Sequence, residues 1–452
     1  MKHLSALVLL GISSAAFSSV VAVIDSGLDV KHPRLVEQIW SNPREISFNS
    51  FDDDQNGFID DLNGWNFAEN SNRLIDMRFL KTYTSDVKRF FEIQLKGLNG
   101  TVDADDKEWL KTKYDDKEFM ADLMKFGNFA HGTHVAGISA SRSLENKIMG
   151  VKLIPTESPL AMTRNYIGRI QGEGKGQKTK EAILRQGLTF LAGQQAQLFV
   201  NVGSYTGKLG ANAANCSFGM NSLAAKNIVA PLLKLLFGVE PDEATIVEYA
   251  NFMVNEVVRQ GRGMALANPK TLFVFAAGND GTDNQVYPIA PANIREENTM
   301  TVAATYKDGR LARFSNFSRE LVDVAAPGVG IVSTIPGGET IPLSGTSQAA
   351  PFVAGVAGGV QAWNASLTPG QVKAILMGTV DKLEALSDKV VSGGIVNAER
   401  AFAAAKFSRE RPIAQAIELA HQDVKDSVQV GALYDPHFEP FVVPLANTLG
   451  SH

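Results

Sequence analysis

Three short segments of the chain place a residue capable of acid–base or nucleophilic chemistry among small residues. Asp25 ends an apolar run, His131 is followed by Gly-Thr-His, and Ser347 lies in the run Gly-Thr-Ser-Gln-Ala-Ala-Pro. A serine hydroxyl attacks only when a base takes its proton. A histidine can be that base, and a carboxylate can hold the histidine in the required tautomer. These residue types predict acyl transfer, provided that the fold brings them together.

Each of these residues also has an ordinary structural interpretation. A serine at a helix start usually caps the helix, and an aspartate after a strand is often part of a turn. His131 and His134 could form a metal pair, but their spacing is i and i+3 with no glutamate between them, unlike the paired-histidine zinc motif. We predict that His131 opens a helix packed closely by the core, with Ser347 near the start of another. We expect His134 to be a hydrogen-bonded interior histidine.

Short apolar runs indicate strands that are buried on both faces. They lie at residues 20–24, 198–202, 272–276, 301–304 and 321–325, and helical stretches at 180–196 and 245–260 lie between some of them. This alternation predicts an α/β fold in which helices cover a mostly parallel sheet. Ligands of such sheets bind beyond the carboxyl ends of the strands. We therefore expect chemistry at Asp25 and in the turn after Ala276.

Five motifs, in order, resemble those of the subtilisin-like serine proteases, the subtilases, from Val21 to about Ala405. The aspartate, histidine and serine motifs correspond to residues 23–27, 131–137 and 345–351; residues 215–219 resemble the substrate-strand motif and residues 276–280 the oxyanion-asparagine motif. Five such motifs in one order would scarcely occur by chance. The resemblance implies a subtilisin-like three-layer fold and a serine endopeptidase that acts on proteins or peptides.

The same resemblance assigns a role to each motif. It implies an acyl-enzyme mechanism with a triad of Asp25, His131 and Ser347 and with Asn279 as a donor to the oxyanion. It assigns pairing with an extended substrate to Ser217, Phe218 and Gly219. The chain departs from the family at Gln348, where methionine is common, and at Phe352, where histidine is common. Two other functions stay open: a catalytically silent peptide-binding module, and an esterase or amidase using the same triad.

An acidic loop at residues 52–61 predicts a calcium site. Oxygen ligands recur at alternate positions around Gly57, as in calcium loops, and suit a hard cation. The expected ligands are Asp52, Asp54, Asn56, the Phe58 carbonyl, Asp60 and Asp61. Asn63 stands where such loops usually have a bidentate glutamate. The Gly-Trp-Asn-Phe sequence that follows is similar to that of some subtilases, which favours a structural Ca²⁺; a solvated acidic turn is the alternative.

The remaining sequence predicts how the chain is divided. Residues 1–16 read as a secretory signal peptide, 17–405 as the peptidase domain and 406–452 as a C-terminal appendage. A helical insert at about 68–129 has apolar positions at helical spacing and is expected to form two amphipathic helices that pack on the main body; a lid or partner surface is the alternative. Because the signal peptide leads almost directly into the first strand, we expect the insert or the tail to take the place of a pro-domain.

Composition excludes several classes of protein. Hydrophobic residues make up 44% and charged residues 20%, which is ordinary for a globular chain. A net charge of −5 offers no basic footprint for nucleic acid, and no segment is expected to span a membrane. The single cysteine, Cys216, allows no intrachain disulfide and is expected to be a buried small hydrophobe. A secreted or periplasmic location follows from the signal peptide, whereas the oligomeric state is not predicted.

Overall fold

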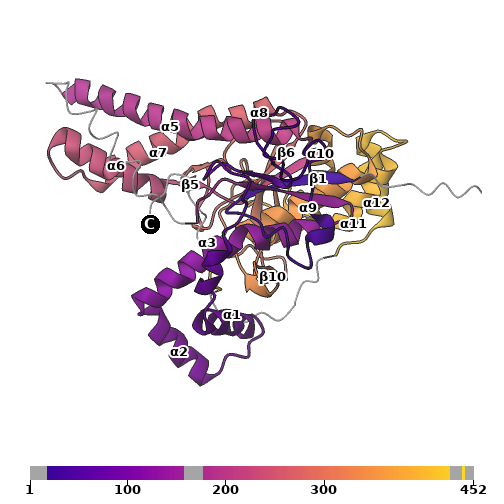
Figure 1. Cartoon of the computed structure of the whole chain (residues 1–452), viewed down its shortest axis with the longest axis horizontal. Helices are drawn as coiled ribbons and strands as arrows, with labels where there is room; N and C mark the ends of the chain where they lie inside the picture. Colours follow the sequence, from indigo (N-terminus) through magenta and orange to yellow (C-terminus); the bar gives the residue numbers. More distant parts are fainter. Residues whose placement is uncertain (1–17, 157–176, 428–439, 443–452) are drawn as a thin grey trace, which may run out of the picture.

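The core of the molecule is one large, mostly parallel sheet. The structure is a computed structural model that describes residues 18–156, 177–427 and 440–442. Within them, nine strands pair in the order β12-β13-β9-β8-β6-β4-β1-β3-β2 (Figure 1). The pairs are parallel except β12 with β13. The bounds, in sheet order, are Asp381–Lys382, Gly394–Ile395, Val324–Pro327, Thr299–Thr305, Leu272–Ala276, Ala213–Cys216, Ser19–Asp25, Asn146–Lys152 and Gly64–Asn66.

Alternate residues of the strands face two different helical layers. Ala22 and Ile24 of β1 join the hydrophobic cluster that contains α5 (Gln177–Lys208), α6 (Ser222–Phe237) and α7 (Glu243–Gly261). Val21 and Val23 join the cluster of α3 (Lys117–Ala140), α9 (Thr346–Trp363) and α10 (Pro369–Gly378). A strand buried on both faces needs apolar residues at every position, which explains its continuous apolar run. The predicted three-layer α/β fold is confirmed.

Smaller elements complete the described chain. Two-stranded sheets pair β10 (Ile331–Thr334) with β11 (Thr340–Leu343) and β5 (Met220–Asn221) with β7 (Ile289–Ala290). The other helices are η1 (Val36–Gln38), η2 (Met77–Thr82), α8 (Gly263–Ala267), η3 (Glu384–Leu386), α11 (Ala398–Phe407) and α12 (Ile413–Asp423). Within the described ranges, every helix is too short or too polar to cross a bilayer.

The strand predicted at residues 198–202 is wrong, because this segment lies inside helix α5. Phe199, Val202 and Tyr205 are buried at helical spacing and continue the apolar face that begins with Leu184 and Leu188. A short apolar run does not by itself distinguish a buried strand from part of a buried helix. The helix predicted at 180–196 therefore extends through the supposed strand.

The helical insert is continuous with the helix that carries the histidine motif. It contains α1 (Ser85–Leu98), α2 (Ala104–Tyr114) and the first half of α3, so the two predicted helices are three. His131 lies in the second half of α3, and the prediction that it opens a helix is wrong. The reason is that the apolar residues before it, including Phe126 and Phe129, are buried against α1 and β11, so the helix has a core to pack on from Lys117 onward. This packing confirms that the insert rests on the main body.

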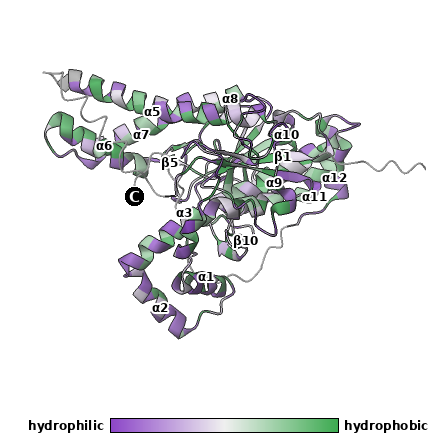
Figure 2. Ribbon diagram, in the orientation of Figure 1, coloured by the Kyte–Doolittle hydropathy of each residue, from purple (hydrophilic) through white to green (hydrophobic). Residues whose placement is uncertain are grey.

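Two groups of helices project from the same side of the molecule. Figure 1 shows α5, α6 and α7 as an arm at the upper left, and α1, α2 and the start of α3 as a second arm at the lower left. Figure 2 shows α2 in hydrophilic colours over most of its length, and Asp106 is its one buried residue. Trp109 connects α2 to α3 through an edge-to-face contact with Phe119, at 5.9 Å between ring centroids. The insert is therefore a small packed unit that shares α3 with the body.

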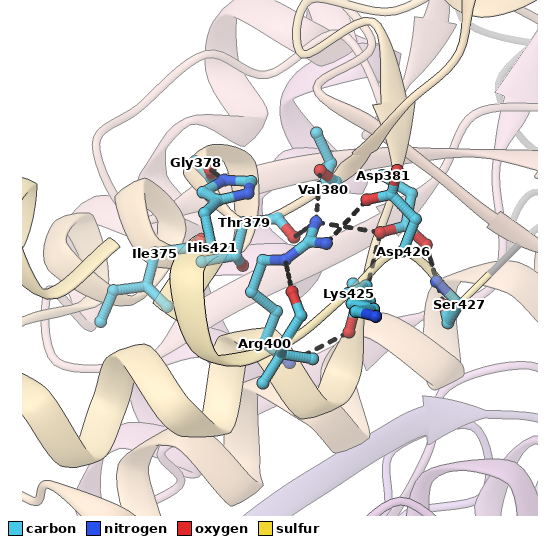
Figure 3. Close-up of polar contacts among 12 residues, drawn as sticks. Ile375, Gly378, Thr379, Val380, Asp381, Arg400, His421, Lys425, Asp426 and Ser427 are labelled. Atoms are coloured by element: carbon cyan, nitrogen blue, oxygen red, sulfur yellow. Dashed lines mark hydrogen bonds and ion pairs between the residues drawn. The ribbon is translucent and has the colours of Figure 1, made fainter. Parts of the chain in front are cut away.

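A buried arginine ties the C-terminal helices to the edge of the sheet (Figure 3). Arg400 of α11 is 2% exposed and contacts Asp381 of β12 at 2.9 Å and Asp426 at 2.7 Å. Its remaining N–H groups donate to the carbonyl oxygens of Thr379, Val380 and Val424. Burial raises the pKa of Asp381, but hydrogen bonds from Asn397 and Ser427 and the charge of Arg400 outweigh it and hold this pKa below its usual range. Through Val424, Asp426 and Ser427, the described start of the predicted appendage thus packs on the edge of the sheet.

Candidate active site

Asp25 and His131 form a buried pair at the carboxyl end of β1. Asp25 Oδ1 lies 2.7 Å from His131 Nδ1 and also accepts a hydrogen bond of 2.7 Å from the backbone N–H of Ser26. Both side chains are almost completely buried. Among the described residues, Asp25 Oδ2 and His131 Nε2 have no hydrogen-bond partner. A carboxylate at Nδ1 favours the tautomer that carries its proton there, which leaves Nε2 as a proton acceptor.

The small residues of the two motifs allow α3 to approach the strand end closely. A Cβ atom on Gly132 would lie 2.1 Å from the carbonyl oxygen of Gly27, so any side chain there would push the helix away. The N–H of Gly132 also donates to Ser26 Oγ at 3.2 Å. The residues next to Asp25 and His131 therefore set the distance between them.

Ser347 is the second residue of α9 and lies beside the neighbouring strand. Its Oγ donates to the carbonyl oxygen of Ser217 at 3.4 Å, and Ser217 Oγ donates to the carbonyl oxygen of Ser347 at 3.1 Å. Cys216 pairs in register with Ile24, so Ser217 is level with Asp25 across one strand spacing. The three predicted residues thus gather at the ends of β1 and β4. In this part of the chain, however, no hydrogen bond joins Ser347 to His131, because the hydroxyl points at Ser217.

Asn279 lies against the first turn of α9, in the turn after β6. Its Oδ1 accepts hydrogen bonds from the N–H of Thr346 at 2.9 Å and from its hydroxyl at 2.8 Å. With the amide oxygen held there, Nδ2 lies 3.4 Å from the position that a Cβ on Gly345 would take. Gly345 has a φ of 156°, which is rare for other residues and places the backbone close to the amide. The NH₂ group is thus beside the start of α9, where backbone N–H groups lack helical partners.

The residues predicted to line the substrate cleft have buried side chains. Phe218 is 1% exposed and packs on Phe199 of α5, with 5.7 Å between ring centroids. A Cβ atom on Gly219 would lie 3.1 Å from the carbonyl oxygen of Ala290. Ser217 is also buried and is linked to Ser347 as described. Any contact of Phe218 with substrate would have to use its backbone, and the substrate role of residues 217–219 stays a prediction.

Two other residues near the site have the environment expected from the sequence. His134, one turn after His131, is buried and lies 3.1 Å through Nε2 from the carbonyl oxygen of Ile341. Burial lowers the pKa of His134 to about 3, so its imidazole stays neutral. Cys216 is buried, and burial raises the pKa of its thiol well above the ordinary value. Neither side chain is placed for chemistry.

The acidic loop brings three carboxylates together, and one of them lies outside the predicted set. Ligand oxygens of Glu45, Asp52 and Asp54 lie within 4.8 Å of one another. Glu45 Oε1 accepts the N–H of Asp54, while its buried Oε2 has no partner among the described residues. Burial raises the pKa of Glu45, and the nearby carboxylates of Asp61 and Asp54 raise it further. Crowded carboxylate oxygens with one buried oxygen unpartnered suit a hard cation.

The other predicted ligands are engaged elsewhere in the loop. Asp60 accepts the backbone N–H groups of Asn49 and Ser50, and Asp61 accepts from Asn42, Asn56 and Tyr205. Burial raises the pKa of Asp61. Asn56 Oδ1 accepts the N–H of Phe58. Glu45 precedes the loop by several residues, and no spacing rule of calcium loops would have found it from the sequence.

Known proteins resemble this chain over most of its length. Subtilisin BL of Lederbergia lenta is 30% identical over 272 residues, which are 60% of this chain and 77% of that protein. An extracellular protease of Xanthomonas campestris pv. campestris is 41% identical over 143 residues, which are 30% of this chain and 24% of that protein. The crystal structure of a cold adapted subtilisin-like serine proteinase has a TM-score of 0.44 at 18% identity and covers 85% of this chain and 90% of its own.

The strongest comparison is with the family as a whole. The sequence profile of the Subtilase family of peptidases matches residues 18–394, which include all five motifs. The match begins before β1 and ends at the first residue of β13, so it includes the insert and the other eight strands of the large sheet. The chain belongs to the subtilase family of serine peptidases.

Proposed function

We propose that this serine-type endopeptidase cleaves peptide bonds in proteins or peptides through an acyl-enzyme formed on Ser347. The observation that carries this proposal is the buried pair of Asp25 and His131, which leaves His131 Nε2 without a partner. His134 also leaves one buried ring nitrogen, Nδ1, without a partner among the described residues, but its other ring nitrogen meets a carbonyl oxygen. Of these two histidines, His131 is the one held by a carboxylate. An imidazole held by a carboxylate on one side and unpartnered on the other is prepared to take a proton.

The proposed reaction has two halves. Ser347 Oγ attacks the carbonyl carbon of the scissile bond while His131 Nε2 takes its proton; the C–N bond then breaks and the leaving amine takes that proton from His131. A water molecule next attacks the acyl-enzyme in the same way and releases Ser347. Asp25 stabilises the imidazolium that forms in both halves. Ser347 must first turn from Ser217 toward His131, a change of one side-chain torsion; catalytic hydrogen bonds often tighten only when substrate is bound.

Two donors would stabilise the tetrahedral oxyanion. They are the Asn279 Nδ2 group and the backbone N–H of Ser347, and both lie at the start of α9. Thr346 holds the amide of Asn279 before substrate arrives, so little reorganisation is needed during the reaction. The positive end of the helix dipole adds to the same effect.

An active-site probe tests the proposal directly. A fluorophosphonate should label the full-length protein and should fail to label Ser347→Ala, while the matched exposed-serine variant Ser387→Ala keeps full labelling. Folded protein that is not labelled would favour the silent peptide-binding module. Labelled protein that hydrolyses small esters but not denatured casein would favour the esterase or amidase.

The calcium proposal concerns stability and is separate from the chemistry. We propose that Glu45, Asp52 and Asp54 hold a structural Ca²⁺, which would neutralise their mutual repulsion and stabilise the native state. A calcium concentration of about 100 times Kd should stabilise the fold by about 2.7 kcal/mol. Thermal unfolding with and without a chelator measures this. Glu45→Gln should abolish the calcium effect and the exposed variant Glu37→Gln should keep it; an unchanged Glu45→Gln response would reject this ligand set.

The division of the chain and its location are proposals of the same kind. We propose that residues 1–16 are removed as a signal peptide, that 17–405 form the peptidase domain and that 406–452 are an appendage, with the protein secreted or periplasmic. The name of the Xanthomonas campestris relative, an extracellular protease, supports this location. Residues 1–17 lie outside the described part of the chain. Mass spectrometry of the mature protein from the culture medium and the periplasm would test the cleavage after residue 16 and the location.

A further inference from the structure

A cavity of about 550 Å³ lies where the end of α3, the strand β10 and the first turns of α9 meet. Its volume is in the range of sites for small ligands. It is lined by the residue that follows the serine, Gln348, and by apolar side chains from several elements. Its apolar lining includes Leu35, Ile138, Val332 and Phe352.

The charged groups at this cavity are all positive. Arg34, Arg142 and Lys307 line it, and no aspartate or glutamate does. Within the described ranges, none of these three cations forms an ion pair with a carboxylate. The chain as a whole carries a net charge of −5, so a cluster of unpaired cations is unexpected here. This asymmetry points to an anion.

Arg142 is the most constrained of these cations. Its guanidinium lies 4.8 Å from the ring centroid of Phe352, and its Nε and one terminal nitrogen donate to Ser141 Oγ at 3.1 and 2.9 Å. Burial lowers the pKa of Arg142, because its charge is partly removed from water without a counter-charge. A bound carboxylate would supply that counter-charge and accept charge-assisted hydrogen bonds.

Gln348 provides an independent indication of a ligand. It is 1% exposed and lines the cavity, yet neither its amide nitrogen nor its amide oxygen has a hydrogen-bond partner among the described residues. A buried, unpartnered amide costs free energy that a ligand atom could restore. Its NH₂ group can donate to an anion, as the nearby guanidinium can.

We propose that this cavity binds a small organic anion with an apolar body, of the aliphatic carboxylate class. The carboxylate is held by Arg142 and the Gln348 amide, with Arg34 and Lys307 at longer range. The hydrocarbon part lies against the apolar side chains of the lining. Because the site does not use the triad, its occupancy can be measured whether or not the protein is catalytically active.

Isothermal titration calorimetry of the full-length protein with hexanoate tests the proposal. We expect saturable binding with one site per chain. Hexanol, which lacks the charge, and inorganic phosphate, which lacks the apolar body, should each bind at least about tenfold more weakly. Phosphate that binds as tightly as hexanoate would overturn the requirement for an apolar body, and hexanol that does so would overturn the requirement for a charge.

Variants locate the binding site. Arg142→Gln should weaken hexanoate binding about tenfold or more, and the exposed variant Lys307→Gln, which is not expected to affect folding, should weaken it by a smaller factor. The matched control Arg185→Gln, on α5, should bind as the unmodified chain does. The absence of saturable hexanoate binding would overturn the proposal. So would equal affinity for hexanoate in all three variants, provided that the Arg142 variant is folded.

Discussion

Two buried carboxylates in this molecule each meet a nitrogen of a basic side chain at a similar distance, and the two contacts differ in what surrounds them. Arg400 and Asp381, at 2.9 Å, are enclosed by carbonyl oxygens, Asn397 and Ser427. Asp25 and His131, at 2.7 Å, each keep one polar atom without a partner in the described structure. The contact of Arg400 with Asp381 leaves the polar atoms of both side chains hydrogen-bonded and holds the C-terminal helices. The contact of Asp25 with His131 leaves polar atoms available for reaction. Burial and distance alone would not separate a structural pair from a catalytic one.

Isosteric substitution of Asp25 and of Asp381 should have the largest effects that distinguish the two contacts. Asp25→Asn should lower kcat by about 10⁴-fold, the size known for another serine protease triad, because the amide favours the wrong histidine tautomer. Its thermal stability should change little. Asp381→Asn is the matched control and should behave in the opposite way, with reduced stability and near-normal kcat for the folded fraction. Equal loss of kcat in both variants would show that the two pairs do not differ as described.

Removal of the buried arginine tests the structural role of the contact between Arg400 and Asp381. Arg400→Met leaves Asp381 buried without its counter-charge, which should cost about 3–5 kcal/mol of the free energy of unfolding. Denaturant unfolding measures this cost. The exposed variant Arg409→Met should be close to neutral. If both variants were equally stable, the cluster shown in Figure 3 would have no special structural role.

Removal of the oxyanion donor should have a smaller effect and should affect activity alone. Asn279→Ala should lower kcat by about 10²–10³-fold, the size measured in subtilisin itself, a relative of this chain, with KM nearly unchanged. The amide stabilises the transition state more than the bound substrate, which is why kcat changes and KM does not. A variant that raised KM with normal kcat would instead assign Asn279 to substrate binding.

The interior histidine of α3, His134, provides a comparison that depends on pH. His134 has a pKa lowered to about 3 by burial, so in the unfolded chain it takes up a proton below about pH 6.5 that the folded chain does not bind. Stability should therefore fall as pH decreases from about 6.5 to about 3, by about 1.4 kcal/mol per pH unit from this residue. His134→Gln should remove this part of the acid slope, measured by denaturant unfolding at several pH values. The control His421→Gln on α12 should retain it, and an unchanged slope in His134→Gln would refute the assignment.

The accuracy of the sequence interpretation depended on whether a feature is local. The runs that became β1, β6 and β8 were identified correctly because a strand buried on both faces is continuously apolar. The run at 198–202 was misread because a buried helix can carry the same pattern over five residues. The start of the histidine helix was misplaced because residues 117–130 become helical by packing on α1 and β11.

The sequence alone determined the family, the order of the motifs and the residue types available for chemistry, because these are properties of short segments. Only the tertiary structure decided that Asp25 meets His131 at 2.7 Å, that Glu45 joins the acidic loop and that Arg400 reaches Asp381. The contacts of Asp25 and of Arg400 join different elements of the fold, and Glu45 reaches the acidic loop from outside the pattern of calcium-loop ligands. Their geometry is set by close packing of helices on the sheet, and no local residue pattern records it.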